Sequence, residues 1–595
     1  MKDLLVIGSA SLDVLHFAGQ SASAAGGAGM YTAVAAHRAG GRVVLFSPKP
    51  DPVPEPLVPV VERVEWIGPV VPPAEMPHFE IAHHGGGKAT LVNASWGAEA
   101  RLSPDELPED LSGYRLIHIT ALGTAQRQLD FLQACRERGA RRVSVGTYAK
   151  VVYGQTETVR ALFEQADLFF MNENEANGLF GSVEAARTAA GKLLFVTLGE
   201  KGAWVIQGDH ATHVPTPAAN ELDPTGAGDT FCGATLAGLA RGEHPVMAAR
   251  KATPLAAQMI EQIGARAHFT SDGLPSELFD PRVVINSQQV ANVAKLVAHL
   301  PEVQPFDFTG AAFPPVGDPA ALDFFFAATL QQFGFWTSQG GRYHEPMIAP
   351  INGALRKGSD YLWHAYMRPL ATDPDFYTPQ RQANLTRAEM RHLLRADDGS
   401  DPMPALDLHL AQAQAYGRDM LALNRTPERL LARANRSSRP LRTFLQLLDH
   451  IGGWKEDPLR KKSGLLALIL NQRPEKFLSF GAHEQMSPVI DYHLMRSCLR
   501  IGLLDVRDDA LSQKLTARQL LSPSEEWGVR RAAYRAIEQI AAASRKSMGA
   551  IDWFFFNARK RCPEMTPPQC AHCQLDPTCA HRKELFQPVR RTTFY

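Results

Sequence analysis

The sequence predicts two domains, the first of the α/β class and the second mostly α-helical. In residues 1–270, short apolar runs alternate with amphipathic stretches, a pattern typical of a parallel sheet with helices on both faces. Beyond residue 282, long helical patterns rich in arginine replace this alternation. A chain of 595 residues is also too long for one ordinary domain. We therefore expect domains at 1–270 and 282–555, a linker at 271–281 and a C-terminal tail at 556–595.

Six apolar runs in the first half are predicted to be strands that are buried on both faces. They span residues 4–7, 43–46, 116–119, 142–145, 168–171 and 193–197. Between and after these runs, apolar residues recur at helical spacing, which predicts helices at 31–39, 125–138, 157–165 and 232–239. Residues 70–102 break the alternation with shorter strand-like pieces, which we expect to form a lid or an added small sheet.

The second half has few strand-like runs, and its apolar residues recur every three or four positions. Helices are expected at residues 320–333, 441–451, 463–470, 492–504 and 527–543. No internal repeat and no low-complexity tract interrupts these patterns.

The composition is that of an ordinary globular protein, with 45% hydrophobic and 21% charged residues, which excludes a fibre, a disordered chain and a small disulfide scaffold. No run of about 18 apolar residues occurs, so we expect no membrane helix. The start of the chain is too short and too acidic for a signal peptide, which favours a cytoplasmic location.

The two halves differ in charge. Residues 1–280 carry 22 basic and 31 acidic side chains, whereas residues 281–595 carry 40 and 31. The excess of positive charge could attract a nucleic acid or a phosphorylated small molecule. Alternatively, the two domains simply complement each other's charge.

A glycine-rich turn, Gly226-Ala227-Gly228, comes just before the helix expected at 232–239 and is followed by Asp229. Glycine lets the backbone N–H groups at a helix N-terminus face an anion, and the helix dipole adds to the attraction. A carboxylate beside that anion can accept the proton of a hydroxyl that attacks a γ-phosphate. A phosphoryl-transfer site with Asp229 as the catalytic base is therefore one interpretation of the pattern, and a tight turn from a strand to a helix is the other.

This segment resembles the signature of the ribokinase family of sugar and nucleoside kinases, also called the PfkB family. Further matches follow in the family's order over about residues 1–270. They are Gly8 and Asp13 after the first strand, Gly26 and Gly27 before the first helix, Asn172 and Glu175 in an Asn-x-x-Glu element, and Thr197, Gly199 and Gly202 in a strand and turn. The resemblance implies a ribokinase-like fold.

The resemblance also implies transfer of the γ-phosphate of ATP, with Mg²⁺, to a hydroxyl of a sugar or nucleoside. The resemblance implies that Gly226, Ala227 and Gly228 form an anion hole and that Asp13, Gly26 and Gly27 bind the substrate. It implies that Asn172 and Glu175 order Mg²⁺ and the phosphates. The nucleotide site would be lined by Thr197, Gly199 and Gly202. Asp223 and Thr225 lie where some members hold a monovalent cation such as K⁺.

One position departs from the family pattern. Tyr31 stands where the family often has an asparagine that reaches the sugar hydroxyls. This makes free ribose a less secure substrate, because an aromatic side chain there could pack against a larger aglycone. The other interpretation is that Tyr31 only packs in the core.

Four cysteines lie within 18 residues near the C-terminus, which in a cytosolic chain suggests a metal rather than disulfides. They are Cys562, Cys570, Cys573 and Cys579. The spacing resembles the [4Fe–4S] loop of helix-hairpin-helix glycosylases of the endonuclease III type, although the first gap has seven residues rather than the usual six. A zinc site is the alternative, in which His572 or His581 could replace a cysteine. In either case we expect the metal to fasten the tail rather than to do chemistry.

Residues 282–505 distantly resemble the queuosine salvage proteins, which are helical N-glycosidases related to the same DNA glycosylases. The matching segments are 333–336, 457–463 and 488–493, but the family's asparagine is missing from the first, and His493 replaces an arginine in the last. The resemblance implies a DNA-glycosylase-like helical fold.

Cleavage of an N-glycosidic bond builds positive charge on the sugar, which a buried carboxylate such as Asp491 can stabilise. Lys461, or its neighbour Lys462, could hold a 5′-phosphate or tune that carboxylate. Phe335 and Trp336 could stack on the base. The alternative interpretation makes Asp491 a helix N-cap, the lysines a solvated face and the two aromatic residues part of the core.

Together these features suggest a bifunctional enzyme that phosphorylates a queuosine-like nucleoside and then releases its base and ribose 5-phosphate. One alternative is a nucleoside hydrolase whose kinase domain captures free ribose. Another is a nucleic-acid-binding repair module, which is less favoured because no clear Gly-rich hairpin for a phosphate backbone occurs. The helical half could also be a non-catalytic binding module. We expect a small-molecule substrate and no membrane partner, and leave a homodimer open.

Overall fold

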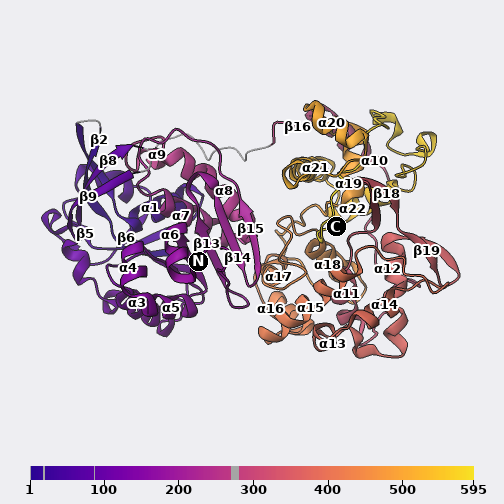
Figure 1. The fold of residues 1–595 in the computed structure, drawn as a ribbon, viewed down its shortest axis with the longest axis horizontal. Coiled ribbons are helices and arrows are strands. Elements are labelled where there is room, and N and C mark those ends of the chain that lie inside the picture. Colours follow the sequence, from indigo (N-terminus) through magenta and orange to yellow (C-terminus); the bar gives the residue numbers. More distant parts are fainter. Residues whose placement is uncertain (1, 18–19, 86–87, 270–279) are drawn as a thin grey trace. The chain divides into compact units, whose positions relative to one another are not determined.

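The computed structural model describes residues 2–17, 20–85, 88–269 and 280–595. The chain divides into two compact units, residues 1–278 and 279–595, which are described separately (Figure 1). Residues 271–279 of the expected linker lie outside the described residues. Among the helices that are described, none is both long and apolar enough to cross a bilayer.

The first unit is built on a nine-stranded sheet with the order β15-β14-β13-β12-β11-β10-β1-β4-β6. All neighbours from β6 to β13 are parallel, and β13, β14 and β15 are antiparallel. The strands are β1 (Lys2–Ile7), β4 (Val43–Phe46), β6 (Glu65–Ile67), β10 (Tyr114–Ile119), β11 (Val143–Gly146), β12 (Leu168–Asn172), β13 (Leu193–Thr197), β14 (Ala203–Gln207) and β15 (His210–Val214). The expected parallel sheet is therefore confirmed.

Helices cover both faces of this sheet, as expected. In β1, Leu4 and Val6 belong to the core on one face, and Leu5 and Ile7 to the core on the other. This alternation explains why a central strand reads as a continuous apolar run. One core is shared with α1 (Ala28–Arg38), α7 (Ala227–Ala240) and α8 (Pro245–Met259), the other with α3 (Ala125–Glu137), α4 (Ala149–Gly154), α5 (Thr156–Gln165) and α6 (Glu173–Phe180).

A second, four-stranded sheet with the order β3-β2-β8-β9 lies beside the main sheet (Figure 1). Its strands are β2 (Ser11–Phe17), β3 (Gln20–Gly26), β8 (His78–Gly85) and β9 (Lys88–Ser95). The expectation of an added small sheet from residues 70–102 is thus correct for β8 and β9. β2 and β3, which bring Asp13 and Gly26 into this sheet, were not predicted from the sequence.

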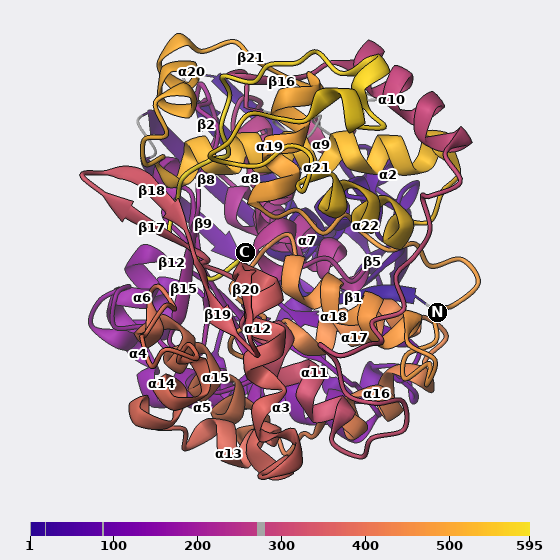
Figure 2. The same ribbon diagram turned by 90° about the vertical axis from the view of Figure 1, so that its right-hand side faces the viewer.

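The second unit contains two helical layers, each with its own apolar core. The first core includes α11 (Ala321–Leu330), α12 (Gly358–Tyr366), α15 (Leu406–Ala422), α17 (Pro440–Leu448) and α18 (Lys461–Gln472). The second includes α10 (Ser287–His299), α19 (Tyr492–Ile501), α21 (Pro523–Ser544) and α22 (Met548–Ala558). Figure 2 shows the second group above the first within this unit. The five helices expected in this half are all present.

Six short strands also occur in the second unit, where the sequence suggested few. They pair as β16 (Val283–Ile285) with β21 (Leu504–Val506), β17 (Trp336–Gln339) with β18 (Arg342–Pro346), and β19 (Ile348–Ile351) with β20 (Ala354–Lys357). Two of these strand pairs are tight hairpins, which turn at Gly340-Gly341 and at Asn352-Gly353. All four turn residues have positive φ. Such turns are a recognised hairpin signal, which a reading based on helical spacing overlooked.

Candidate active sites

The glycine-rich turn of the first unit forms the N-terminus of α7. Gly226 is the N-cap residue, with φ of 79°, and its carbonyl accepts the N–H of Thr230 at 2.8 Å. The N–H of Ala227 bonds to the carbonyl of Pro224 at 3.2 Å. The N–H groups of Gly228 and Asp229 have no acceptor among the described residues. They are the unpaired donors that a helix start offers to an anion.

The ring of Tyr31 packs against this turn at Gly226. A Cβ atom added to Gly226 would lie 2.6 Å from the Tyr31 ring, so only glycine fits there. Tyr31 is 2% exposed, and its ring makes an edge contact with His268 at 6.4 Å. The structure therefore gives Tyr31 a packing role, which is the second of the two interpretations of this residue.

Asp223 fastens the start of the same turn. Its carboxylate accepts the N–H of Thr225 at 2.9 Å and the N–H of Gly264 at 2.8 Å. Because each carboxylate oxygen bonds to a backbone N–H, Asp223 joins the turn to the segment that follows α8. The K⁺ expected near Asp223 and Thr225 stays a prediction.

Asp229, in this turn, and Glu175, at the start of α6, are two carboxyl groups near enough for the charge of Asp229 to act on Glu175. Burial raises the pKa of Asp229 to about 7. Burial also raises the pKa of Glu175 to about 7, and the charge of Asp229 adds to this shift. Carboxylate oxygens are ligands that Mg²⁺ prefers. Glu175 therefore fits the Mg²⁺ that the sequence suggested for Asn172 and Glu175.

The Asn-x-x-Glu element is a helix capping box at the start of α6. The Asn172 side chain accepts the N–H of Glu175 at 2.9 Å, and its Nδ2 donates to Glu175 Oε1 at 2.7 Å. The Glu175 carboxylate in turn accepts the N–H of Asn172 at 3.0 Å. The box fixes Glu175 in a buried position next to Asp229.

Asp13 lies in β2 and is 4% exposed. A Cβ atom on Gly26 would lie 1.7 Å from Asp13 Oδ2, so the glycine makes room for the carboxyl group. Burial raises the pKa of Asp13 to about 6, and its Oδ1 atom has no hydrogen-bond partner among the described residues. An unpaired buried oxygen is costly, so this atom suits a hydroxyl group of a substrate. Gly27, with φ of 93°, passes close to the carbonyl of Ser9.

The expected nucleotide side lies where β13 ends at Thr197 and turns into β14. A Cβ atom on Gly202, which has φ of 91°, would lie 2.1 Å from the carbonyl of Val214. Gly202 is thus required by the fold. Gly199, with φ of 60°, has no atom within 4 Å of its Cβ position and faces open space.

In the second unit, Lys461 and Lys462 begin α18 and are 6% and 2% exposed, so they do not form a solvated face. Lys461 Nζ donates to the carbonyl of Gln332 and Lys462 Nζ to that of Leu330, both at 3.0 Å. Burial lowers the pKa of Lys461, and the charges of Asp491 and Asp552 oppose this effect. The structure therefore places Lys461 near both carboxyl groups.

Asp491 is the N-cap of α19, as one of the two interpretations held, and accepts the N–H of Leu494 at 2.9 Å. Asp552, on α22, was missed by the sequence analysis. It sits inside an apolar helix, Met548–Ala558, without any motif around it. A single acidic residue among Trp and Phe residues was the only available signal.

Phe335 and Trp336 are 5% and 4% exposed, so both rings are covered by the protein. Trp336 stacks on Tyr343 at 5.5 Å, and the Arg591 guanidinium lies 4.0 Å from the centre of its ring. Phe335 contacts the Cβ position of Gly358 at 3.1 Å. The structure thus gives both residues the core position of the alternative interpretation.

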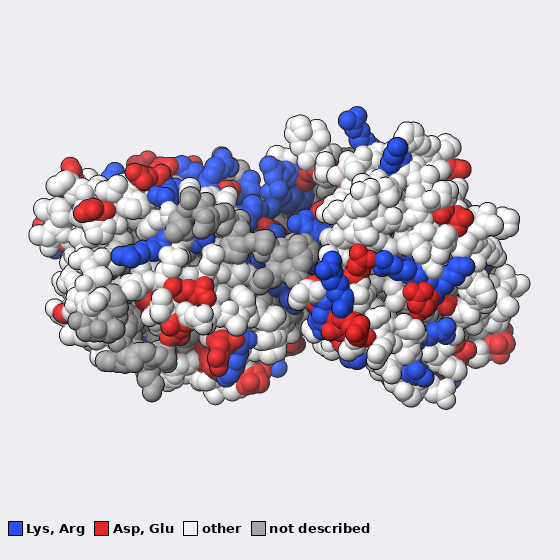
Figure 3. Space-filling model, turned by 90° about the horizontal axis from the view of Figure 1, so that it is seen from above, with Lys and Arg blue, Asp and Glu red and all other residues white. Residues whose placement is uncertain are grey.

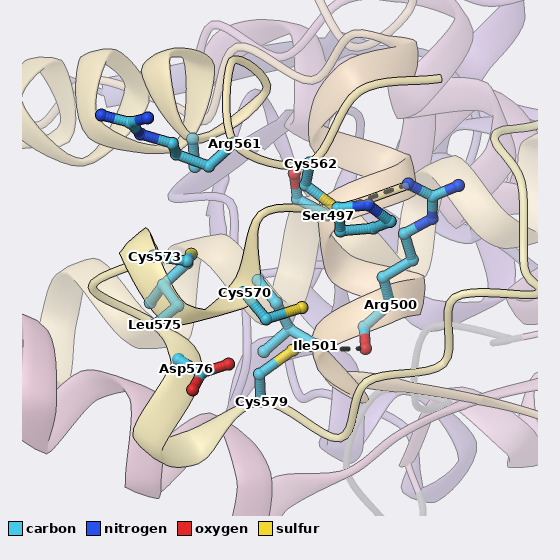
Figure 4. Close-up of a pocket in the computed structure, with 12 residues that line it drawn as sticks. Ser497, Arg500, Ile501, Arg561, Cys562, Cys570, Cys573, Leu575, Asp576 and Cys579 are labelled. Carbon is cyan, nitrogen blue, oxygen red and sulfur yellow. Dashed lines mark hydrogen bonds between the residues drawn. The ribbon is translucent and has the colours of Figure 1, made fainter. Parts of the chain in front are cut away.

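The four C-terminal cysteines line one cavity of about 40 Å³ (Figure 4). Arg500 Nη1, on α19, donates to the Cys562 sulfur at 3.3 Å. Among the described residues, only Cys570, Asp576 and His581 have metal-binding atoms that all lie within 4.8 Å of one another. A zinc ion with four thiolates would hold its sulfurs about 3.8 Å apart, given Zn–S bonds of about 2.3 Å. The cysteines therefore surround a space larger than one such ion needs.

Comparison with known proteins concerns the first unit. Residues 77–271 match the family model described as pfkB family carbohydrate kinase. The chain is 30% identical over 255 residues to the cytidine kinase of Thermococcus kodakarensis, covering 41% of this chain and 90% of that protein. It is 26% identical over 172 residues to the aminoimidazole riboside kinase of Salmonella typhimurium, covering 26% of this chain and 53% of that protein.

Among solved structures, the adenosine kinase of Sinorhizobium meliloti is 20% identical, covering 44% of this chain and 95% of that chain, with a TM-score of 0.38. None of these findings supports a glycosidase or a queuosine salvage protein in the second unit. The likeness to the cytidine kinase nevertheless spans nearly that whole enzyme, and the match to the family model includes the glycine-rich turn. The chain belongs to the PfkB family of carbohydrate kinases.

Proposed function

We propose that the first unit phosphorylates the ribose 5′-hydroxyl of a nucleoside and that the second unit then hydrolyses the N-glycosidic bond of the product. The observation that carries the kinase step is the turn from Gly226 to Asp229. It combines two unpaired backbone N–H groups with a carboxyl group whose pKa is raised to about 7. Such a group can take a proton near neutral pH, while the N–H groups stabilise the charge of the transferring phosphoryl group.

The residues around the turn fit the rest of a kinase site. Asp13 offers a buried, unpaired oxygen to a sugar hydroxyl. Asn172 and Glu175 are the residues that would hold Mg²⁺, which when bound neutralises charge on the phosphates of ATP. Thr197 ends β13 and Gly199 lies in the turn that follows, where no atom lies within 4 Å of the Cβ position of Gly199.

A nucleoside is favoured over a free sugar as the acceptor. Two of the relatives, a cytidine kinase and an aminoimidazole riboside kinase, are named for nucleosides. Purified full-length protein with ATP and Mg²⁺ should add one phosphate to ribonucleosides at least about tenfold faster than to ribose, as followed by mass spectrometry. Faster phosphorylation of ribose would favour the ribose-capturing alternative, and no phosphorylation of either would contradict the kinase proposal.

For the second unit, the observation that favours hydrolysis is the group of Lys461 and Asp491, which are buried, and Asp552, which is partly buried. A carboxylate can stabilise the positive charge that develops on the sugar as the bond to the base breaks. A buried lysine at the same place can hold the 5′-phosphate that the first unit adds. A queuosine-like nucleoside is our proposed substrate, because segments 457–463 and 488–493 resemble those of the queuosine salvage proteins.

A nucleic-acid-binding repair module is less well supported. A surface for duplex DNA is expected to gather lysine and arginine on one face. Figure 3 shows one face of the second unit on which lysine and arginine side chains lie among aspartate and glutamate. Release of queuine from queuosine 5′-phosphate without ATP would support the hydrolase. Salt-dependent DNA binding without hydrolysis would favour the repair module.

The cysteine loop is proposed to hold a [4Fe–4S] cluster that fastens the C-terminal tail. Four thiols around a cavity of about 40 Å³ fit a centre with four cysteine ligands that is larger than one zinc ion. Analysis of protein purified without oxygen should give about four iron atoms and four acid-labile sulfides per chain. One zinc atom and no sulfide would favour the zinc alternative.

A further inference from the structure

Asp552 belongs to the group proposed for hydrolysis but has no separate role in that step so far, although its helix contacts the helices that carry Lys461 and Asp491. α22 packs on the C-terminal end of α18 at Gly549, where an added Cβ atom would lie 1.9 Å from Gln472 Nε2. α22 also packs against α19, the helix that begins after Asp491. Phe556, one turn after Asp552, meets the ring of His493, which is two residues after Asp491, so this part of α22 lies beside the start of α19. The charges of Asp491 and Lys461 both act on Asp552.

The two carboxyl groups have different surroundings. Asp491 caps α19, and a helix N-terminus stabilises negative charge. Asp552 lies within α22 and has no such partner. Burial raises the pKa of Asp552 to about 8, the charge of Asp491 raises it further, and the charge of Lys461 opposes both. The raised pKa favours the protonated form of Asp552 near neutral pH.

Aromatic side chains flank Asp552 on its own helix. Trp553 stacks on Phe306 with ring centres 4.1 Å apart and ring planes 9° from parallel. Phe556 meets the His493 ring at 6.2 Å, edge to face, and lies 3.6 Å below the Arg559 guanidinium. Trp553 and Phe556 are only partly buried, unlike Phe335 and Trp336. Flat apolar surfaces that remain accessible beside an acid suit a heterocyclic base.

We propose that Asp552 is the general acid of the second unit and protonates the base as it leaves, while Asp491 accepts the proton of the water that adds to the sugar. This inference rests on the proposed hydrolase function. The bond between C1′ and the base nitrogen breaks, its electron pair stays with the base, and the base takes the proton of Asp552. Water adds to C1′ and gives its proton to Asp491. Exchange with solvent then restores both carboxyl groups.

Two substrates separate this role from a structural one. Queuosine 5′-phosphate has a base that leaves with difficulty unless it is protonated, whereas 4-nitrophenyl β-D-ribofuranoside 5-phosphate has a leaving group that needs no proton. Asp552→Asn should lower kcat at least about 100-fold for the first substrate and less than about threefold for the second. Asp491→Asn should lower kcat for both. The exposed Asp509, changed to Asn, is the matched control and should alter neither.

The pH profile gives an independent readout. Because Asp552 must be protonated, the kcat of the wild type on the nucleotide should fall above about pH 8, and Asp552→Asn should abolish this alkaline limb. Asp491 and Lys461 are the charged groups that face Asp552 from α19 and α18. Since asparagine has nearly the same size and shape as the aspartic acid it replaces, the variant should keep the thermal midpoint of the wild type, which circular dichroism would check.

The outcomes distinguish the role of Asp552 from the hydrolase function on which it rests. An equal loss on both substrates in Asp552→Asn, with the alkaline limb unchanged, would overturn the role of Asp552 and leave the hydrolase standing. If the wild type cleaves neither substrate, the hydrolase itself is wrong and the role of Asp552 falls with it. A selective loss on the nucleotide supports both.

Discussion

The two units assemble their candidate sites in different ways. In the first, the key groups are neighbours in the chain: a single turn from Gly226 to Asp229 supplies both the N–H groups and the carboxyl group. In the second, Lys461, Asp491 and Asp552 come from the starts of two helices and the middle of a third. A site made by one turn depends on local backbone geometry, whereas a site made by three helices depends on their packing.

This difference predicts how each site fails. The turn should lose function through single changes that leave the fold intact, because its donors are backbone groups and its base is one side chain. The helical site should be sensitive to residues that never touch a substrate. Asp457 is such a residue, since it accepts the N–H of Lys461 at 2.7 Å and pairs with Arg530 through bonds of 2.8 and 2.7 Å.

The largest effect is expected for Asp229→Asn in the first unit. Loss of the base should lower kcat for nucleoside phosphorylation about 1,000-fold, because the attacking hydroxyl keeps its proton. Steady-state kinetics with ATP and cytidine would measure it. Asp209, whose side chain is 98% exposed, gives a matched Asn variant that should retain full activity. A loss below about tenfold in Asp229→Asn would show that another group is the base.

In the second unit, Asp457→Ala should lower the free energy of unfolding by about 3–5 kcal/mol, because it leaves the fully buried Arg530 without its partner. Thermal unfolding followed by circular dichroism would show the loss as a lower midpoint for this unit. The exposed pair of Arg387 and Asp407 provides the control, and Asp407→Ala should change stability by less than about 1 kcal/mol. Equal effects of the two variants would contradict the packing role of Asp457.

A pair of glycine variants tests the turn itself. Gly226→Ala should destabilise the first unit by about 2–3 kcal/mol, because it forces a side chain into positive φ and against the Tyr31 ring. Gly228→Ala should cost less than about 1 kcal/mol, since its Cβ position faces open space. Chemical denaturation of both variants measures the difference. Equal stability would mean that Tyr31 does not support the turn.

The smallest expected effect is a pH dependence of the kinase. The pKa of Asp229 is raised to about 7, and the base must be deprotonated to act. The kcat/KM for the nucleoside should therefore be level above about pH 8 and fall about tenfold for each pH unit below 6. In the active but weaker Asp229→Glu variant, the position of this limb should move. A profile that is flat from pH 5 to 8 would contradict the assignment.

The fold of the first unit could be predicted from the sequence because its central strands are apolar on both faces and its glycines mark turns and helix starts. β1 and β13 were found in this way, whereas β15 was missed because its residues alternate between partly buried and exposed. The site residues of this unit lie in turns and caps that have sequence signatures. Tyr31 was located correctly in a helix, but its contact with Gly226 depends on tertiary packing.

The second unit was less predictable for a physical reason. Lys461 was predicted either to hold a phosphate or to lie on a solvated face, yet its Nζ is buried and donates to the carbonyl of Gln332, 129 residues away. Asp552 carries no motif, and its importance comes only from the packing of α22 on α18 and α19. Trp336 looked like a stacking platform, yet Tyr343 and Arg591 cover it. Contacts between residues distant in sequence decide each of these cases.

The most direct test of the central claim, that the kinase makes the substrate of the hydrolase, is base release with and without ATP. The full-length protein is incubated with queuosine and Mg²⁺, and queuine is followed by mass spectrometry. We expect queuine only when ATP is present, no queuine from Asp229→Asn, and accumulation of queuosine 5′-phosphate in Asp491→Asn. Release of queuine from unphosphorylated queuosine at the same rate without ATP would contradict the claim.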